Sequence, residues 1–313
     1  MAVLRGTLIP IYRIQLTRVC DQSIVEIANP KVIIVGCGNL GEKIGDIFAL
    51  HTNFQVLGVR RNPSEQGNFP ILAKDIFADD FSEWIVAENP NYIIYSATPS
   101  TSKPSDYQKI YVEGLRKITD VIQSNNLQTR VFFISSTRVF NGSSKLEALD
   151  DYDEISPNDE QGEILGHAER IAIINGRGNV FRLTGIYGLE RTMMLRLAQD
   201  QESWPANRFT NRIYDEDAAN IIVKIISSKH TDPKFDLPKI INVADSHPVE
   251  LYSVLNFIRK KLNLPEVHLE FTDKVVGKKI ISTFLSKKIN YQFKHPSFES
   301  GYTEIIQKMD RQL

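Results

Sequence analysis

Apolar residues follow two alternating spacings from about residue 31 onward. Short β-branched or aromatic runs have the length and composition of buried strands. They lie at residues 31–35, 54–59, 71–76, 92–95, 131–134 and 180–183. Between them, apolar residues recur at the intervals of amphipathic helices, over residues 40–48, 81–88, 110–122 and 164–172. This alternation predicts an α/β fold, a Rossmann-like doubly wound parallel sheet with helices on both faces.

Beyond residue 184 the pattern is looser. It predicts helices at 193–199 and 218–226, a short strand at 240–243, and a helix that begins with Pro248 in its first turn. From residue 264 onward we expect a mixture of short strands and helices. A chain of 313 residues has room for about two domains. The predicted parts are an N-terminal extension (1–29), a nucleotide-binding domain (30–183 plus 236–246) and a smaller, discontinuous C-terminal substrate domain (184–235 plus 247–313).

The composition narrows the range of functions. Lysine and arginine total 37 and aspartate and glutamate 38, so the net charge of −1 argues against a general nucleic-acid binder. No apolar run approaches the length of a membrane span. Two cysteines cannot form a disulfide scaffold or a four-cysteine zinc site, and we predict no metal. We expect a cytoplasmic protein whose partner is a small-molecule substrate, with neither nucleic acid nor membrane, and a homodimer as an open option.

The N-terminal segment leaves a second location open. Arg5, Arg13 and Arg18 precede the first acidic residue, Asp21, which is the charge bias of an organelle-targeting peptide. The stretch has no serine and contains Pro10, which are not typical of such a peptide. The simpler interpretation is an arm that packs on the body of the protein, or an upstream start site.

A glycine-rich turn follows the first predicted strand. Its sequence, Gly36-Cys37-Gly38-Asn39-Leu40-Gly41, has the G-x-G-x-x-G pattern between a strand and a helix, which is the context that dinucleotide binding needs. The first glycine permits the tight turn, and the second lets the backbone approach a pyrophosphate. The third allows close helix–strand packing, and the helix N-terminus offers free N–H groups. The alternative is a glycine turn without a ligand.

The end of the second strand indicates which dinucleotide is bound. An NAD site usually has an acidic residue here for the ribose 2′-hydroxyl, whereas this chain has Arg60 and Arg61. Arginine can pair with the 2′-phosphate of NADP, so we favour NADP(H) over NAD(H). The alternative is that these arginines face solvent. Asp75, beside the expected adenine, and Ala97, after the fourth strand, complete the predicted cofactor site.

Four later stretches carry a resemblance to a known family. They are Ser135-Ser136-Thr137-Arg138-Val139-Phe140, Phe181-Arg182-Leu183-Thr184-Gly185-Ile186-Tyr187-Gly188, Asn211 to Ala219, and Ile241-Asn242-Val243. With the glycine turn, they resemble the motifs of the extended short-chain dehydrogenase/reductases, the NAD(P)-dependent epimerase/dehydratase-like group. The resemblance implies a Rossmann-like fold, a nicotinamide cofactor and a substrate cleft beside Ser136. The glycine spacing departs from the G-x-x-G-x-x-G of the extended members.

The resemblance fails at the catalytic pair. The family uses a tyrosine about 25 residues after the serine as general acid/base, and a lysine four residues later that lowers its pKa. Here these positions are Gln161 and Leu165, which can neither exchange a proton at neutral pH nor carry a charge. The chain is thus similar to atypical members that keep the nucleotide fold and lose the Tyr-x-x-x-Lys pair.

The candidate catalytic residues are therefore Ser136, Gln161, His167 and Tyr187. Ser136 would orient a substrate carbonyl, and His167 can change charge near neutral pH. The structural alternatives are a surface or packing role for His167 and packing against the sheet for Tyr187. Cys37 lies where a helix dipole could lower its pKa, but we interpret it as a small buried filler.

Two functions remain open from the sequence. The favoured one is an NADP(H)-dependent oxidoreductase or epimerase-type enzyme that acts on a small carbonyl, imine or sugar-like substrate with non-standard acid/base residues. The alternative is a catalytically reduced protein that binds NADP(H) as a sensor or scaffold.

Overall fold

The computed structural model describes residues 29–63, 67–267 and 275–311. The basic N-terminal segment, and with it the predicted arm or targeting peptide, lies outside the described residues. Eleven strands are formed: β1 (Lys31–Val35), β2 (Gln55–Arg60), β3 (Ile71–Ala73), β4 (Tyr92–Tyr95), β5 (Arg130–Ser136), β6 (Asn179–Leu183), β7 (Gly185–Tyr187), β8 (Phe209–Thr210), β9 (Arg212–Tyr214), β10 (Ile240–Val243) and β11 (Val249–Glu250), all within the described ranges.

The α-helices are α1 (Asn39–His51), α2 (Phe81–Glu88), α3 (Pro104–Tyr107), α4 (Leu115–Ser124), α5 (Glu160–Ile174), α6 (Met193–Gln199), α7 (Asp215–Thr231), α8 (Leu251–Lys261) and α9 (Phe298–Asp310). Two short 3₁₀ helices, η2 (Thr137–Phe140) and η3 (Gln201–Ser203), and two π-helical segments, η1 (Gln108–Gly114) and η4 (Leu285–Ile289), complete the described elements.

Seven strands form one parallel sheet in the order β10-β6-β5-β4-β1-β2-β3. The chain leaves β1 toward one edge through β2 and β3 and then returns to pair β4 with the other side of β1. The space beyond the carboxyl ends of β1 and β4 is therefore the point where the strand order reverses, which is where ligands bind in such sheets. The predicted doubly wound α/β fold is confirmed.

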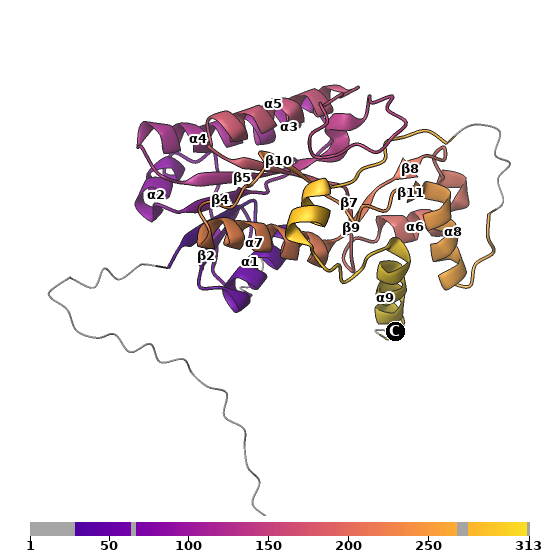
Figure 1. Cartoon of the computed structure of the whole chain (residues 1–313). Helices are drawn as coiled ribbons and strands as arrows, with labels where there is room; N and C mark the ends of the chain where they lie inside the picture. Colours follow the sequence, from indigo (N-terminus) through magenta and orange to yellow (C-terminus); the bar gives the residue numbers. More distant parts are fainter. Residues whose placement is uncertain (1–28, 64–66, 268–274, 312–313) are drawn as a thin grey trace, which may run out of the picture.

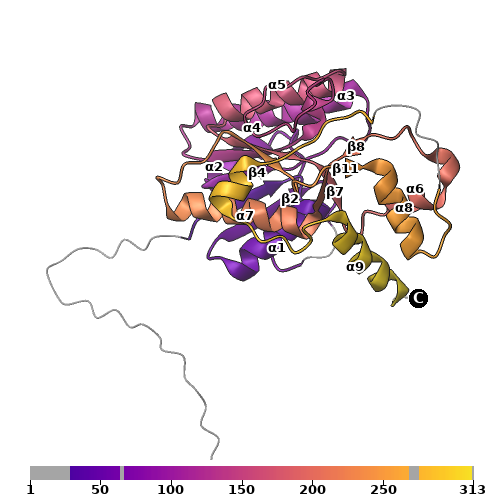
Figure 2. The same ribbon diagram turned by 45° about the vertical axis from the view of Figure 1, so that its right-hand side comes forward.

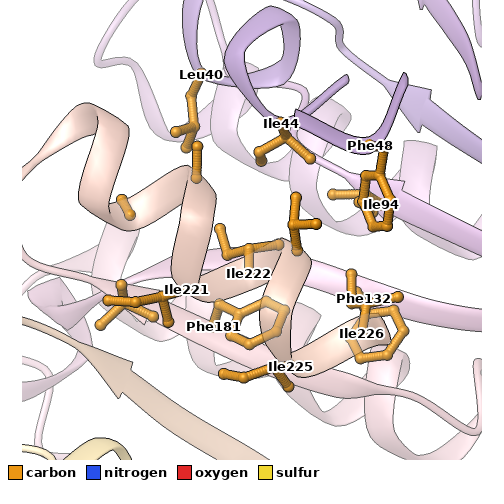
Figure 3. Packing of buried hydrophobic residues seen from close by; sticks show 14 of the residues in the cluster. Leu40, Ile44, Phe48, Ile94, Phe132, Phe181, Ile221, Ile222, Ile225 and Ile226 are labelled. Carbon is orange, nitrogen blue, oxygen red and sulfur yellow. The ribbon is translucent and has the colours of Figure 1, made fainter. Parts of the chain in front are cut away.

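Helices cover both faces of this sheet (Figures 1 and 2). On one face α1 and α7 pack against the strands, with Ile44 and Phe48 of α1 and Ile222 of α7 fully buried (Figure 3). On the other face α2, α4 and α5 bury a second set of apolar residues. Both faces of the central strands are thus removed from water, which explains their nearly continuous apolar sequences.

A third, smaller core lies beside the sheet. Helices α6, α8 and α9 lie together here (Figure 1). The core between them contains Tyr187, Tyr214 and Tyr302, whose side chains are buried. The chain enters this region after β6, returns to the main sheet at β10, and leaves again. The pairing of β10 with β6 confirms the strand predicted at 240–243.

Several expected elements have different limits. The predicted helix at 110–122 is an α-helix only in its second half, α4. Its first half belongs to the π-helical segment η1, in which i→i+5 hydrogen bonds replace the α-helical ones, and α3 comes directly before η1. The third strand ends at Ala73. Pro248 does not start a helix, because the next two residues pair with β8 and α8 begins at Leu251. No helix in the described ranges is both long and apolar enough to cross a membrane.

Candidate functional site

The turn after β1 depends on glycine at its first position. Gly36 has a φ of +81°, and a Cβ there would lie 2.2 Å from the Cα of Ala97. Only glycine combines this left-handed backbone with so close an approach. The Ser96 hydroxyl donates to the Gly36 carbonyl at 3.1 Å, which ties the turn to the end of β4. Gly36 and Ala97 therefore form the floor of the switch point, as the sequence predicted for a cofactor site.

The other two glycines have different surroundings. A Cβ on Gly38, the residue before α1, would meet no atom within 4 Å, so open space lies over the turn. A Cβ on Gly41 would lie 3.1 Å from Cγ2 of Ile34, which shows the close packing of α1 on β1. Leu40 is buried in the core and offers a ligand only its backbone. The first N–H groups of a helix lack intrahelical partners, so the start of α1 beside this open space suits an anion.

A cavity of about 420 Å³ adjoins this turn. It extends past the ends of β2 and β3 and the loop after β4. Six of the predicted cofactor residues line it: Gly36, Gly38, Arg60, Arg61, Asp75 and Ala97. The structure thus brings together residues spread over 62 positions of the sequence, in a space that suits the adenosine half of a dinucleotide.

The polar side chains of this cavity are held in different ways. The Arg60 guanidinium pairs with the Glu42 carboxylate at 2.6 Å, whereas Arg61 is exposed at the rim. Asp75 accepts a hydrogen bond from the backbone N–H of Phe77 at 2.9 Å and so shapes the turn after β3. Both arginines are therefore available at the mouth, with Arg60 oriented by an acidic residue that the sequence analysis did not consider.

Cys37 is fully buried beside the glycine turn. Burial, with a smaller contribution from Glu42, raises the pKa of its thiol to about 12. Burial therefore outweighs the helix dipole. A Cβ on Gly58 would lie 2.8 Å from the Cys37 sulfur, so the thiol fills space between α1 and β2.

Ser136 lies at the carboxyl end of β5, next to the cluster that replaces the family's catalytic pair. Its hydroxyl accepts the backbone N–H of Arg138 at 3.2 Å. The Arg138 guanidinium pairs with Asp159 at 2.9 Å and donates to the Gln161 side-chain oxygen at 3.3 Å. The Gln161 amide in turn donates to the Ser102 carbonyl at 2.7 Å. Arg138 thus links Ser136 to Gln161, and Gln161 holds the loop after β4.

Leu165, at the position of the family's lysine, is buried in the core under α5, with 1% of its surface exposed. It contributes to packing and offers no charge.

The other two catalytic candidates, His167 and Tyr187, lie elsewhere. The pKa of His167 is lowered by burial and by Arg170 and Arg116, which places it among cations between α4 and α5.

Tyr187 belongs to the third core. Its ring stacks on Tyr302 with centroids 4.8 Å apart, and its hydroxyl donates to the Ser297 carbonyl at 3.2 Å. Burial raises the pKa of its hydroxyl well above the ordinary value, and the nearby Asp245 adds to the effect. The side chain therefore stays protonated and packs in the third core, rather than against the main sheet as the alternative supposed.

The structure adds a residue that the sequence analysis missed. Lys278 lies on the segment of residues 275–284, which runs from β8 past Leu149 toward the loop before α5 (parallel bridges Arg208–Val276 and Leu149–Ile280). Its amine donates to the Thr137 carbonyl and, at 2.6 Å, to the side-chain oxygen of Asn141. Both partners are neutral and follow Ser136 closely in the chain.

The amine of Lys278 has an unusual electrostatic setting. Among the described residues no carboxylate lies within 4.0 Å of it, and Arg138 and Arg208 are nearby cations. Burial is the main cause that lowers its pKa to about 8, these cations add to the effect, and Asp159 opposes it. Lys278, whose amine contacts the residue after Ser136, therefore has a pKa much closer to neutral pH than that of an ordinary lysine. Within the described ranges, no group of three or more His, Cys, Asp or Glu side chains could hold a metal ion.

No protein-family model matches the sequence, and no curated relative matches it. Solved structures do match. A protein assigned as an NAD-dependent epimerase/dehydratase from Methylobacillus flagellatus is 27% identical, with a TM-score of 0.75 over 90% of this chain and 99% of that chain. UDP-glucose 4-epimerase from Thermotoga maritima (13% identical, TM-score 0.71) and dTDP-glucose 4,6-dehydratase from Bacillus anthracis (12%, 0.71) each cover 90% of this chain, and the matches span 99% and 97% of those chains.

These matches span the sheet and the third core alike, because nine-tenths of the chain is covered in each case. The similarity agrees with the seven-stranded parallel sheet that is covered by helices on both faces. The fold of this chain is that of the NAD(P)-dependent epimerase/dehydratase-like group, and its resemblance to the extended short-chain dehydrogenase/reductases is confirmed.

Proposed function

We propose that this protein binds NADP(H) and acts as an oxidoreductase or epimerase-type enzyme on a small carbonyl, imine or sugar-like substrate. The observation that carries the proposal is the cavity that joins the glycine turn to Arg60, Arg61 and Asp75. The open space over Gly38 and the free helix N-terminus suit a pyrophosphate. Arg60 and Arg61 at the far end suit a 2′-phosphate.

The substrate would lie beside Ser136. Bound NADPH would supply a hydride to the substrate carbon at this position. The Ser136 hydroxyl would orient the carbonyl or imine by a hydrogen bond, and Lys278 would give the proton that the oxygen needs. With a pKa of about 8, Lys278 is largely protonated at pH 7 and can act as an acid. Gln161, held by Ser102 and Arg138, would shape the cleft without proton exchange.

A specific observation favours the alternative function, an NADP(H)-binding sensor or scaffold. Gln161 and Leu165 are both fully engaged in structural contacts, so nothing at these positions is poised for the family's chemistry. Under this alternative the cofactor would bind, but no substrate would be turned over.

The experiment is a crystal structure with NADPH combined with a turnover assay on aldehydes, ketones, imines and nucleotide sugars. The proposal predicts Ser136 within about 3.5 Å of the substrate position next to nicotinamide C4. It also predicts turnover that is lost in Ser136→Ala. Binding without turnover on the whole panel would favour the sensor or scaffold. Absence of NADPH and NADH binding would contradict both functions.

A further inference from the structure

A tight turn between β7 and α6 lies beside the N-terminus of α1, next to the glycine motif. The backbone N–H of Arg191 donates to the Gly188 carbonyl at 3.0 Å and closes the turn. A Cβ on Gly188 would lie 2.2 Å from a carboxylate oxygen of Asp215, so glycine is needed for the turn to lie against the start of α7. Asp215 is buried, with 1% of its surface exposed. The position of the turn is therefore fixed by packing.

This turn contacts the glycine motif directly. The Arg191 guanidinium donates to the side-chain oxygen of Asn39 at 3.3 Å, and the Asn39 amide donates to the Glu190 carboxylate. Asn39 is the first residue of α1, immediately after Gly38. Two residues about 150 positions away in the sequence thus lie at the helix end where a pyrophosphate is expected.

The hydrogen-bonding capacity of Arg191 is largely unused. Its Nε–H is buried and has no hydrogen-bond partner in the described part of the chain. No carboxylate lies within 4.0 Å of its guanidinium among those residues, although its charge helps to lower the pKa of Asp215 against the larger effect of burial. A buried guanidinium N–H without an acceptor is costly, and the planar guanidinium matches the geometry of phosphate oxygens.

We infer that Arg191 is a further cofactor-binding residue, which donates to the pyrophosphate of NADP(H) beside the N-terminus of α1. The inference rests on the proposed function. Arg60 would then recognise the 2′-phosphate at one end, and Arg191 would recognise the two bridging phosphates at the other. Asn39 connects this turn to α1, because its side chain holds Glu190 and Arg191 against the first turn of the helix.

The test separates the two phosphate sites by calorimetric titration with NADPH and with adenosine 2′-monophosphate, which lacks the pyrophosphate. Arg191→Ala is expected to weaken NADPH binding by about ten-fold or more, the effect of losing a charged hydrogen bond. Its affinity for adenosine 2′-monophosphate should equal that of the wild type. Arg191→Lys should recover part of the NADPH affinity, since it keeps the charge. Arg196→Ala, at an exposed arginine on α6, is the matched control and should bind both ligands normally.

Unchanged NADPH affinity in Arg191→Ala would overturn the inference while leaving the proposed function intact. An equal loss for both ligands, with a lowered melting temperature, would also overturn it, because it would show a structural role. If the wild type binds neither NADPH nor NADH, the proposed function itself fails, and this result is distinguishable because no variant is needed to see it.

Discussion

The guanidinium of Arg60 lies 2.6 Å from the carboxylate of Glu42, so the residue at the end of β2 is held by the first turn of α1. The two side chains are each about one-third exposed. An incoming 2′-phosphate would meet Arg60 already oriented and would compete with Glu42 for its donors. Glu42 therefore orients Arg60 and, in the proposed site, would also weaken its binding to a 2′-phosphate.

This relationship gives a prediction for Glu42→Gln. Removal of the carboxylate should tighten NADPH binding by about two- to five-fold, the size of a partly exposed ion-pair effect. NADH lacks the 2′-phosphate, and its affinity should stay within error. Fluorescence titration of both cofactors measures the effect, with Glu163→Gln, an exposed residue of α5, as the control. An equal gain for both cofactors would show that Arg60 does not recognise the 2′-phosphate.

The missing catalytic pair gives a second prediction. The double variant Gln161→Tyr, Leu165→Lys should not gain strong dehydrogenase activity. A lysine at the buried position 165 would lose its charge and destabilise the core. A tyrosine at 161 would lose the contacts to Ser102 and Arg138, and a misplacement near 1 Å can cost about 100-fold in rate. Assays on carbonyls and nucleotide sugars, with thermal melts, provide the measurement.

We expect the double variant to melt below the wild type and to show no new turnover. Robust turnover that appears only in the double variant would mean that the cleft is still arranged for the family's chemistry. The interpretation of Gln161 as a fixed structural residue would then be wrong.

Lys278 should lose its proton near pH 8. Burial disfavours the charged amine, so its pKa lies below the ordinary value of about 10.5. Below pH 8 the amine is mostly charged, and above pH 8 it is mostly neutral. Side-chain NMR of ¹⁵N- and ¹³C-labelled protein should show one lysine resonance that titrates near pH 8 and is absent in Lys278→Arg.

The same shift has a consequence for stability. In the folded state Lys278 releases its proton at a lower pH than in the unfolded chain, so its contribution to the free energy of unfolding should rise between about pH 8 and 10.5. Lys278→Met should lack this rise. A Lys278 resonance that titrates with the surface lysines would contradict the assignment of this residue as an acid near neutral pH.

Cys37 should be unreactive in the folded protein. Burial raises the pKa of its thiol to about 12, so almost no thiolate exists at pH 8. In the variant Cys20→Ser, Cys37 is the remaining thiol. An aromatic disulfide reagent at pH 8 should label this variant slowly when folded and fully once it is unfolded in guanidinium chloride. Rapid labelling of the folded variant would instead show an activated thiol beside the phosphate turn.

Local sequence was enough to predict the parts of the site that one strand and one turn build. Gly36 and Gly38 follow β1, Arg60 is the last residue of β2, and strand ends meet at one edge of a parallel sheet. The predicted end of the third strand and the predicted start of the helix near Pro248 were wrong. Both limits depend on strand pairing with other segments, which local sequence does not show. The sequence left Tyr187 open between a catalytic role and a packing role. Its packing contact is with Tyr302, which belongs to a helix near the C-terminus.

Lys278 and Arg191 could not be found from the sequence. Lys278 contacts a carbonyl 141 positions earlier, and Arg191 contacts an asparagine 152 positions earlier. Neither residue lies in a segment with a recognisable chemical pattern, so only the folded chain places Lys278 beside Thr137 and Arg191 beside Asn39. Sequence reasoning therefore reached the residues that line the cavity, whereas the placement of Lys278 and Arg191 needed the structure.

The central claim is that this chain binds NADP(H) at the cavity formed by the glycine turn, Arg60 and Arg61. Calorimetric titration of the unmodified protein with NADPH and with NADH, at one salt concentration, tests it most directly. We predict saturable binding of NADPH, about ten-fold or more tighter than NADH, because a charged hydrogen bond to the 2′-phosphate is worth roughly 1.5–3 kcal/mol. Equal affinity for the two cofactors, or no binding of either, would contradict the claim.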